Sequence, residues 1–119
     1  MDNARRGKRF RDLVLEAKSE IQEVDASSLR QWLAEKRTLV VLDVREADDY
    51  AAGTVPQALN LSRGLLELEI DEMVPDQETV IVTVCGGGSR SALAAQTLLK
   101  MGYGQVYSLA GGYRGWHVQ

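Results

Sequence analysis

The sequence has few of the residues that form covalent or metal-bound frameworks. Among its 119 residues there are one cysteine, one histidine and two prolines. One cysteine excludes an internal disulfide, and one cysteine with one histidine falls short of the ligand set of a usual zinc site, so we expect no metal. No apolar run approaches the ~20 residues of a membrane-spanning helix. The small net charge of -3 indicates neither a nucleic acid nor a membrane surface as partner.

The length and composition predict a single domain. One layered core can be built at this size, and 45% hydrophobic with 26% charged residues is ordinary for a globular protein. The N-terminus is basic, with Arg5, Arg6, Lys8, Arg9 and Arg11. Mixed charge follows it without a continuous apolar stretch, so it is not a secretory signal. We expect a cytoplasmic protein, because a lone thiol stays reduced there.

Two helices are predicted near the N-terminus. Apolar residues recur at helical spacing at Phe10, Leu13, Val14, Ala17 and Ile21. This pattern indicates an amphipathic helix with one buried stripe. Asp25 or Ser27 is expected to cap a second helix through residues 29–33. We therefore divide the chain into a basic segment with its helix, residues 1–22, and a domain, residues 23–119.

The rest of the chain alternates strands and helices. Residues 38–44 and 79–84 are short, apolar and rich in β-branched side chains, as in parallel strands covered on both faces. The other expected elements are a turn-rich stretch at 53–60, a short helix at 65–73, a helix at 91–101 capped by Gly102, a strand at 105–109 and a short helix after Gly111 and Gly112. This alternation predicts an α/β domain with a parallel central sheet and helices on both faces.

The chemistry is expected directly after the second apolar strand. The segment there reads Cys85, Gly86, Gly87, Gly88, Ser89 and Arg90, and a helix follows it. The carboxyl end of a central parallel strand opens onto the crevice where α/β folds bind ligands. Glycines let the loop curl and direct backbone N–H groups at one point, where the helix dipole adds positive potential. With the permanent charge of Arg90, these groups form an anion-binding cradle around a sulfur atom.

This environment is expected to lower the pKa of the Cys85 thiol. A thiolate there could attack the outer sulfur of an anionic donor and hold it as a persulfide, without a metal or organic cofactor. A nucleotide-binding P-loop is the competing interpretation of a glycine-rich loop after a strand. It would need a Gly-Lys-Ser/Thr ending, whereas this loop ends Gly-Ser-Arg, so that interpretation fails.

From Val24 to Trp116 the chain resembles the rhodanese homology family, of the single-domain thiosulfate sulfurtransferase type. The matching pieces are Leu42 to Arg45 with Tyr50 and Gly53, then Val55, Pro56, Ala58 and Asn60, then Cys85 to Arg90, and last Leu109 to Gly112 with Trp116. The resemblance implies a parallel sheet flanked by helices and transfer of sulfane sulfur through a Cys85 persulfide. It implies a small anionic donor and an acceptor that is cyanide, a thiol or a protein.

The length of the loop bears on the type of reaction. Four residues separate Cys85 from Arg90, the size associated with sulfurtransferases, whereas the related phosphatases and arsenate reductases carry one more. A phosphatase or reductase using the same cysteine stays an alternative, as does a protein-interaction module with an incidental thiol. The chain also departs from the family's pattern. Thr54 replaces a common histidine and Gln57 a common glycine, which we interpret as turn variation, and Gly86 and Gly87 replace frequent polar residues.

Three other polar residues are interpreted as structural. Asp43 ends a strand near the site and is expected to pair with Arg45 or with backbone N–H groups, because buried charges need partners. A thiol that is already ionised needs no general base. His117, the only histidine, is expected on the surface of the last helix and not beside Cys85.

Overall fold

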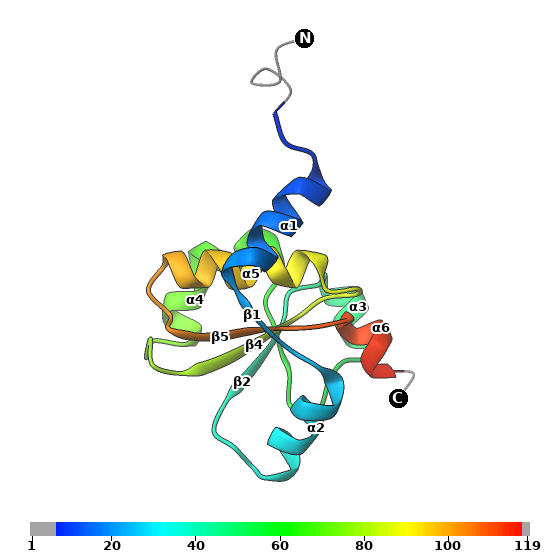
Figure 1. Ribbon diagram of the computed structural model, residues 1–119. Coiled ribbons are helices and arrows are strands. Elements are labelled where there is room, and N and C mark those ends of the chain that lie inside the picture. The colour runs from blue at the N-terminus through cyan, green and yellow to red at the C-terminus, as the bar shows by residue number, and fades with distance from the viewer. Residues whose placement is uncertain (1–6, 118–119) are drawn as a thin grey trace.

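A five-stranded parallel sheet organises the protein, whose computed structural model describes residues 7–117 (Figure 1). The strands are β1 (Gln22–Val24), β2 (Val40–Asp43), β3 (Leu59–Asn60), β4 (Val80–Val84) and β5 (Gln105–Leu109), in the spatial order β1-β5-β4-β2-β3. β4 is central, and its last residue Val84 pairs with Asp43, the last residue of β2. The segments that follow these two strands therefore leave the sheet at the same edge.

Helices cover both faces of the sheet, as predicted. They are α1 (Phe10–Glu20), α2 (Ala26–Ala34), α3 (Ala47–Ala52), the 3-10 turn η2 (Arg63–Leu65), α4 (Leu66–Met73), α5 (Ser89–Lys100) and α6 (Gly112–His117). Figure 1 shows α4 and α5 on one side of the sheet and α2 on the other. Between residues 7 and 117, none of these helices combines the length and apolarity needed to cross a membrane.

The apolar run of β4 is explained by a core on each of its faces. Ile81 belongs to a cluster with Leu66 of α4 and Leu98 of α5. Its neighbour Val82 belongs to the opposite cluster, with Leu29 of α2 and other residues of that face. Successive side chains of a strand point to opposite faces, so a strand with a core on each face is apolar along most of its length.

The N-terminal helix is present, but its predicted buried stripe is only half correct. Val14 and Ala17 are buried where α1 packs on α5, whereas Phe10 is 55% and Leu13 42% exposed. Figure 1 shows the reason, because the first turn of α1 extends beyond α5 and away from the domain. Arg5 and Arg6 of the basic segment lie outside the described residues, and the division at residue 22 stays a prediction.

Several element bounds differ from the predictions. α5 begins at Ser89, two residues before the predicted start, and Asp25 rather than Ser27 caps α2 by accepting a hydrogen bond from the Ser28 N–H at 2.7 Å. Gly102 ends α5 with a φ of +104°, as expected of a left-handed cap. The strands β1 and β3 and the helix α3 were not predicted. They are short, and α3 buries none of its residues, so it has no apolar period.

Gln57 occupies a backbone conformation that suits glycine. Its φ is +61°, in the left-handed region that costs an ordinary residue roughly 1–2 kcal/mol. A glycine would adopt this φ without strain.

We predict that Gln57→Gly stabilises the protein by about 1 kcal/mol, since relief of strain exceeds the entropy of a more flexible unfolded chain. The thermal midpoint should rise by about 4 °C for a domain of this size. As a control, Gln31→Gly inside α2 makes the same chemical change in a helix, and should destabilise by about 1 kcal/mol. Destabilisation by Gln57→Gly would contradict the strain argument.

Candidate active site

Cys85 directly follows β4 and is buried, with a relative exposure of 1%. The backbone N–H of Gly88 donates a hydrogen bond to Sγ at 3.0 Å. The Ser91 hydroxyl lies 3.3 Å from Sγ on the first turns of α5. The sulfur therefore contacts hydrogen-bond donors from the loop and from the helix that follows it.

Two further buried hydroxyl groups support Ser91. Its Oγ lies 2.8 Å from Oγ of Ser108 on β5, and both serines are fully buried. Thr83 on β4 donates to the Ser91 carbonyl at 2.8 Å. When the sulfur is a thiolate, Ser91 donates to it and Ser108 donates to Ser91, so each hydroxyl proton has an acceptor. Sequence reasoning missed both serines, although Ser108 interrupts an otherwise apolar strand end.

The pKa of Cys85 lies below the ordinary value of a cysteine. Burial is the largest single influence and raises the pKa, because it disfavours the charged form. Hydrogen bonds from the Ser91 hydroxyl and from the N–H groups of Ser91, Gly88 and Gly87 act in the opposite direction and together prevail. The expected lowering is thus supported, and its cause is direct donation to the sulfur.

The loop of residues 85–90, called the Cys85 loop below, is held from behind by α6. The N–H groups of Tyr113 and Arg114 donate to the carbonyls of Cys85 and Gly86 at 2.7 and 3.0 Å. Gly112 makes this approach possible, because a Cβ there would lie 2.5 Å from the Gly86 oxygen, and its φ is +60°. Gly88 turns the chain into α5 with a φ of +101°. Two glycines thus fix the shape of the loop.

The predicted site residues of the loop differ in how deeply they are buried. Gly88 is buried beside the sulfur, Gly86 and Ser89 are half-buried, and Gly87 and Arg90 are exposed. Ser89 and Arg90 are the first two residues of α5 and not part of a separate loop. Across residues 7–117 the Arg90 side chain makes no hydrogen bond or ion pair with the protein. Its role in binding an anion stays a prediction.

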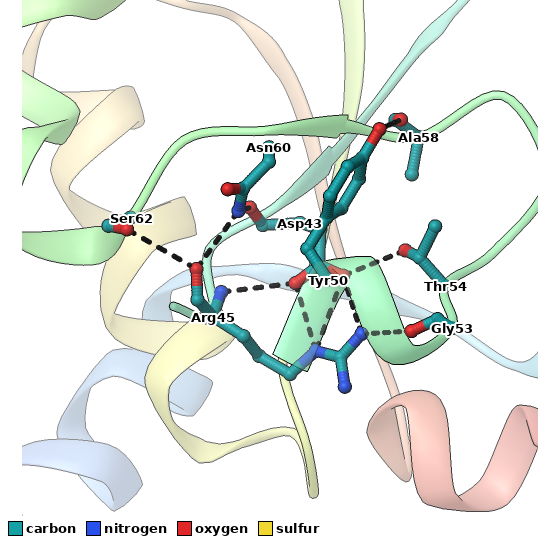
Figure 2. A network of polar contacts seen from close by, with 8 residues as sticks. All are labelled: Asp43, Arg45, Tyr50, Gly53, Thr54, Ala58, Asn60 and Ser62. Atoms are coloured by element: carbon teal, nitrogen blue, oxygen red, sulfur yellow. Dashed lines mark hydrogen bonds and ion pairs between the residues drawn. The ribbon is translucent and has the colours of Figure 1, made fainter. Parts of the chain in front are cut away.

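Asp43 and Arg45 form a buried ion pair at the end of β2 (Figure 2). Asp43 Oδ2 accepts from Arg45 Nη2 and from the Thr54 hydroxyl, each at 2.7 Å. Its Oδ1 accepts from the Arg45 backbone N–H and from Nε at 3.0 and 3.1 Å. The carboxylate is therefore fully used in structural contacts, which supports its structural interpretation. Thr54 does more than vary a turn, since it completes this network.

Arg45 also connects the network to α6. Its Nη2 donates to the Gly53 carbonyl at 2.6 Å, and its guanidinium lies 4.7 Å from the centre of the Tyr113 ring. His117 is exposed, with its ring 5.6 Å from that of Tyr113. In the described part of the chain His117 makes no hydrogen bond to Cys85, as the surface interpretation expects.

Comparison with known proteins agrees with this geometry. The family model of the rhodanese-like domain matches residues 25–119. A sulfurtransferase of Allochromatium vinosum is 35% identical over 96 residues, which cover 81% of this chain and 88% of that protein. The thiosulfate sulfurtransferase GlpE of Coxiella burnetii is 38% identical over 91 residues, covering 76% of this chain and 83% of that protein. The chain belongs to the rhodanese-like domain family, and its enzymatic class is sulfurtransferase.

A solved structure extends the likeness beyond the family match. It is a protein from Rhodopseudomonas palustris of unknown function, described as a possible tyrosine phosphatase. The two chains are 27% identical with a TM-score of 0.85, and the match covers 93% of this chain and 90% of that one. This share is larger than residues 25–119, so part of the N-terminal 24 residues also has a counterpart there.

We predict that Ser91→Ala shifts the reactivity of Cys85 to higher pH. Removing the hydroxyl removes a donor to the thiolate, and the opposing effect of burial remains, so the pKa of Cys85 rises. The measurement is the rate of alkylation by iodoacetamide against pH, which follows the thiolate fraction of the only thiol. Ser27→Ala, on the exposed surface of α2, is the control and should leave the profile unchanged. An unshifted Ser91→Ala profile would contradict the role of Ser91.

A second prediction concerns the buried ion pair. Arg45→Met leaves the Asp43 carboxylate buried without its cation, and should lower the free energy of unfolding by about 3–5 kcal/mol. Thr54→Val removes one hydrogen bond to the same carboxylate and should cost about 1–2 kcal/mol. Urea unfolding measures both. If the ion pair is structural, iodoacetamide should alkylate Cys85 at the wild-type rate in the variants that remain folded. A slower rate would contradict a purely structural role of the pair.

Proposed function

We propose that the protein transfers sulfane sulfur from an anionic donor such as thiosulfate, with Cys85 as the nucleophile and persulfide carrier. The thiolate attacks the outer sulfur and forms a sulfur–sulfur bond. The bond within the donor breaks, and its electron pair leaves with sulfite. The terminal sulfur of the persulfide then passes to cyanide or to an acceptor thiolate, and Cys85 is regenerated as a thiolate without net oxidation.

The observation that carries this proposal is the set of donors around Sγ. Hydrogen bonds from the Ser91 hydroxyl and from backbone N–H groups stabilise negative charge on the sulfur, so the site favours a thiolate. In the persulfide the charge moves to the outer sulfur, close to the same N–H groups of the Cys85 loop. Backbone donors fixed by secondary structure need no reorganisation as the charge moves.

The dimensions of the site favour sulfur over phosphate. Cys85 is 1% exposed, and only four residues separate it from Arg90. A single terminal sulfur atom is narrow enough to approach such a thiol, whereas a phosphate ester brings a tetrahedral group that needs a wider ring of N–H donors. The names of the A. vinosum and C. burnetii relatives agree with sulfur as the atom transferred.

The test is the intact mass of the protein after incubation with thiosulfate. We expect the mass to rise by one sulfur atom, and to return to its initial value when cyanide is added. Cys85→Ser should show no gain, while the matched control Ser27→Cys/Cys85→Ser keeps one thiol at a site without the loop and should also show none. Absence of an adduct with thiosulfate and with persulfide donors would overturn the proposal.

The same preparation tests the phosphatase alternative, which the description of the R. palustris protein brings forward. Hydrolysis of an aryl phosphate by the wild type, lost in Cys85→Ser, together with no sulfur adduct, would assign the cysteine to phosphate chemistry. We expect no such hydrolysis.

A further inference from the structure

The guanidinium of Arg114 lies across the two glycines that follow Cys85. A Cβ atom built on Gly86 or on Gly87 would come within 3.3 Å of Arg114 Nη2. The atom on Gly87 would also meet Cζ at 3.5 Å and Nη1 at 3.6 Å. The whole head of the side chain therefore faces the Cys85 loop, and the absence of Cβ atoms on the two glycines lets it lie this close.

The backbone holds Arg114 at this place. Its N–H donates to the Gly86 carbonyl at 3.0 Å, next to the bond from Tyr113 to Cys85. The residue is thus attached to the loop by its main chain while its side chain covers the loop from outside. Arg114 is exposed to solvent, and within residues 7–117 no carboxylate forms an ion pair with it. Its positive charge is not neutralised by those residues.

We propose that Arg114 binds the substrate and makes the site select sulfur donors that end in an oxyanion group. The inference rests on the proposed function and names the class of donor. The outer sulfur of such a donor points at Sγ, and its oxyanion end lies toward the guanidinium, whose planar set of donors matches two oxygens at once. Arg114 supplies from α6 the charge that polar residues at positions 86 and 87 would supply from the loop.

Charge selection can be measured on Cys85 without sulfur transfer. Iodoacetate and iodoacetamide alkylate a thiolate by the same reaction, but only iodoacetate is an anion. Cys85 is the only thiol, so both rates report on this site alone. The ratio of the two rates cancels any change in the thiolate fraction and isolates the effect of the reagent's charge.

We expect the iodoacetate-to-iodoacetamide ratio to fall about tenfold in Arg114→Gln at low ionic strength, which corresponds to ~1.4 kcal/mol. Arg114→Lys keeps the charge and should retain most of the ratio. The control Arg11→Gln removes a charge from exposed α1 and should leave the ratio unchanged. The wild-type ratio should also fall with added salt, because ions screen exposed charges, and that of Arg114→Gln should depend less on salt.

For the enzyme, Arg114→Gln should lower kcat/KM for thiosulfate about tenfold, because the lost contact is with the oxyanion end of the donor, which leaves as sulfite. A wild-type alkylation ratio in Arg114→Gln would overturn the inference, as would an equal loss of both alkylation rates. A fallen ratio in a protein that gains no sulfur from thiosulfate would support Arg114 as the anion-selecting residue and contradict the proposed function instead.

Discussion

The site depends on two hydrogen bonds that join the start of α6 to the back of the Cys85 loop. They consume the carbonyls of Cys85 and Gly86, so the N–H groups of the loop are left to face the sulfur. A loop in which carbonyls and N–H groups alternated in direction would place partial negative charge beside the thiol. The electrostatics at Sγ therefore follows from where the carbonyls are bound, and this is decided by a helix at the other end of the domain's sequence.

The same helix meets the second polar network. Tyr113 stacks beside the Arg45 guanidinium, and Arg45 binds Asp43 at the end of β2. β2 and β4 are neighbours with their last residues in register, so both networks are anchored at one edge of the sheet. The ion pair, α6 and the Cys85 loop form a continuous set of contacts. A buried pair of this kind gains little net stability, but removal of one partner leaves an uncompensated buried charge.

The sequence allowed prediction of those elements that are determined by residues close together in the chain. β2, β4 and β5 were visible as apolar runs, and Cys85 with its glycines was visible as a motif. Arg114 was not, because it reaches Gly86 only through the pairing of β4 with β5 and the turn at Gly111 and Gly112. α3 was not predicted because none of its residues is fully buried and only Tyr50 packs against the core, so it has no apolar period. Phe10 was placed in a buried stripe, since a periodic pattern shows which face of a helix is apolar but not how far the neighbouring helix extends.

Gly112 has a consequence for reading mutational data. A Cβ there would lie 2.5 Å from the Gly86 carbonyl oxygen, so any substitution forces the loop or α6 to shift, although Gly112 has no reactive group. A scan that scored activity alone would rank it with Cys85. The two substitutions would act differently. Replacing Cys85 removes the reacting sulfur, whereas replacing Gly112 opens the loop around a sulfur that is still present. To distinguish the two substitutions, the number of free thiols per protein has to be measured together with the activity.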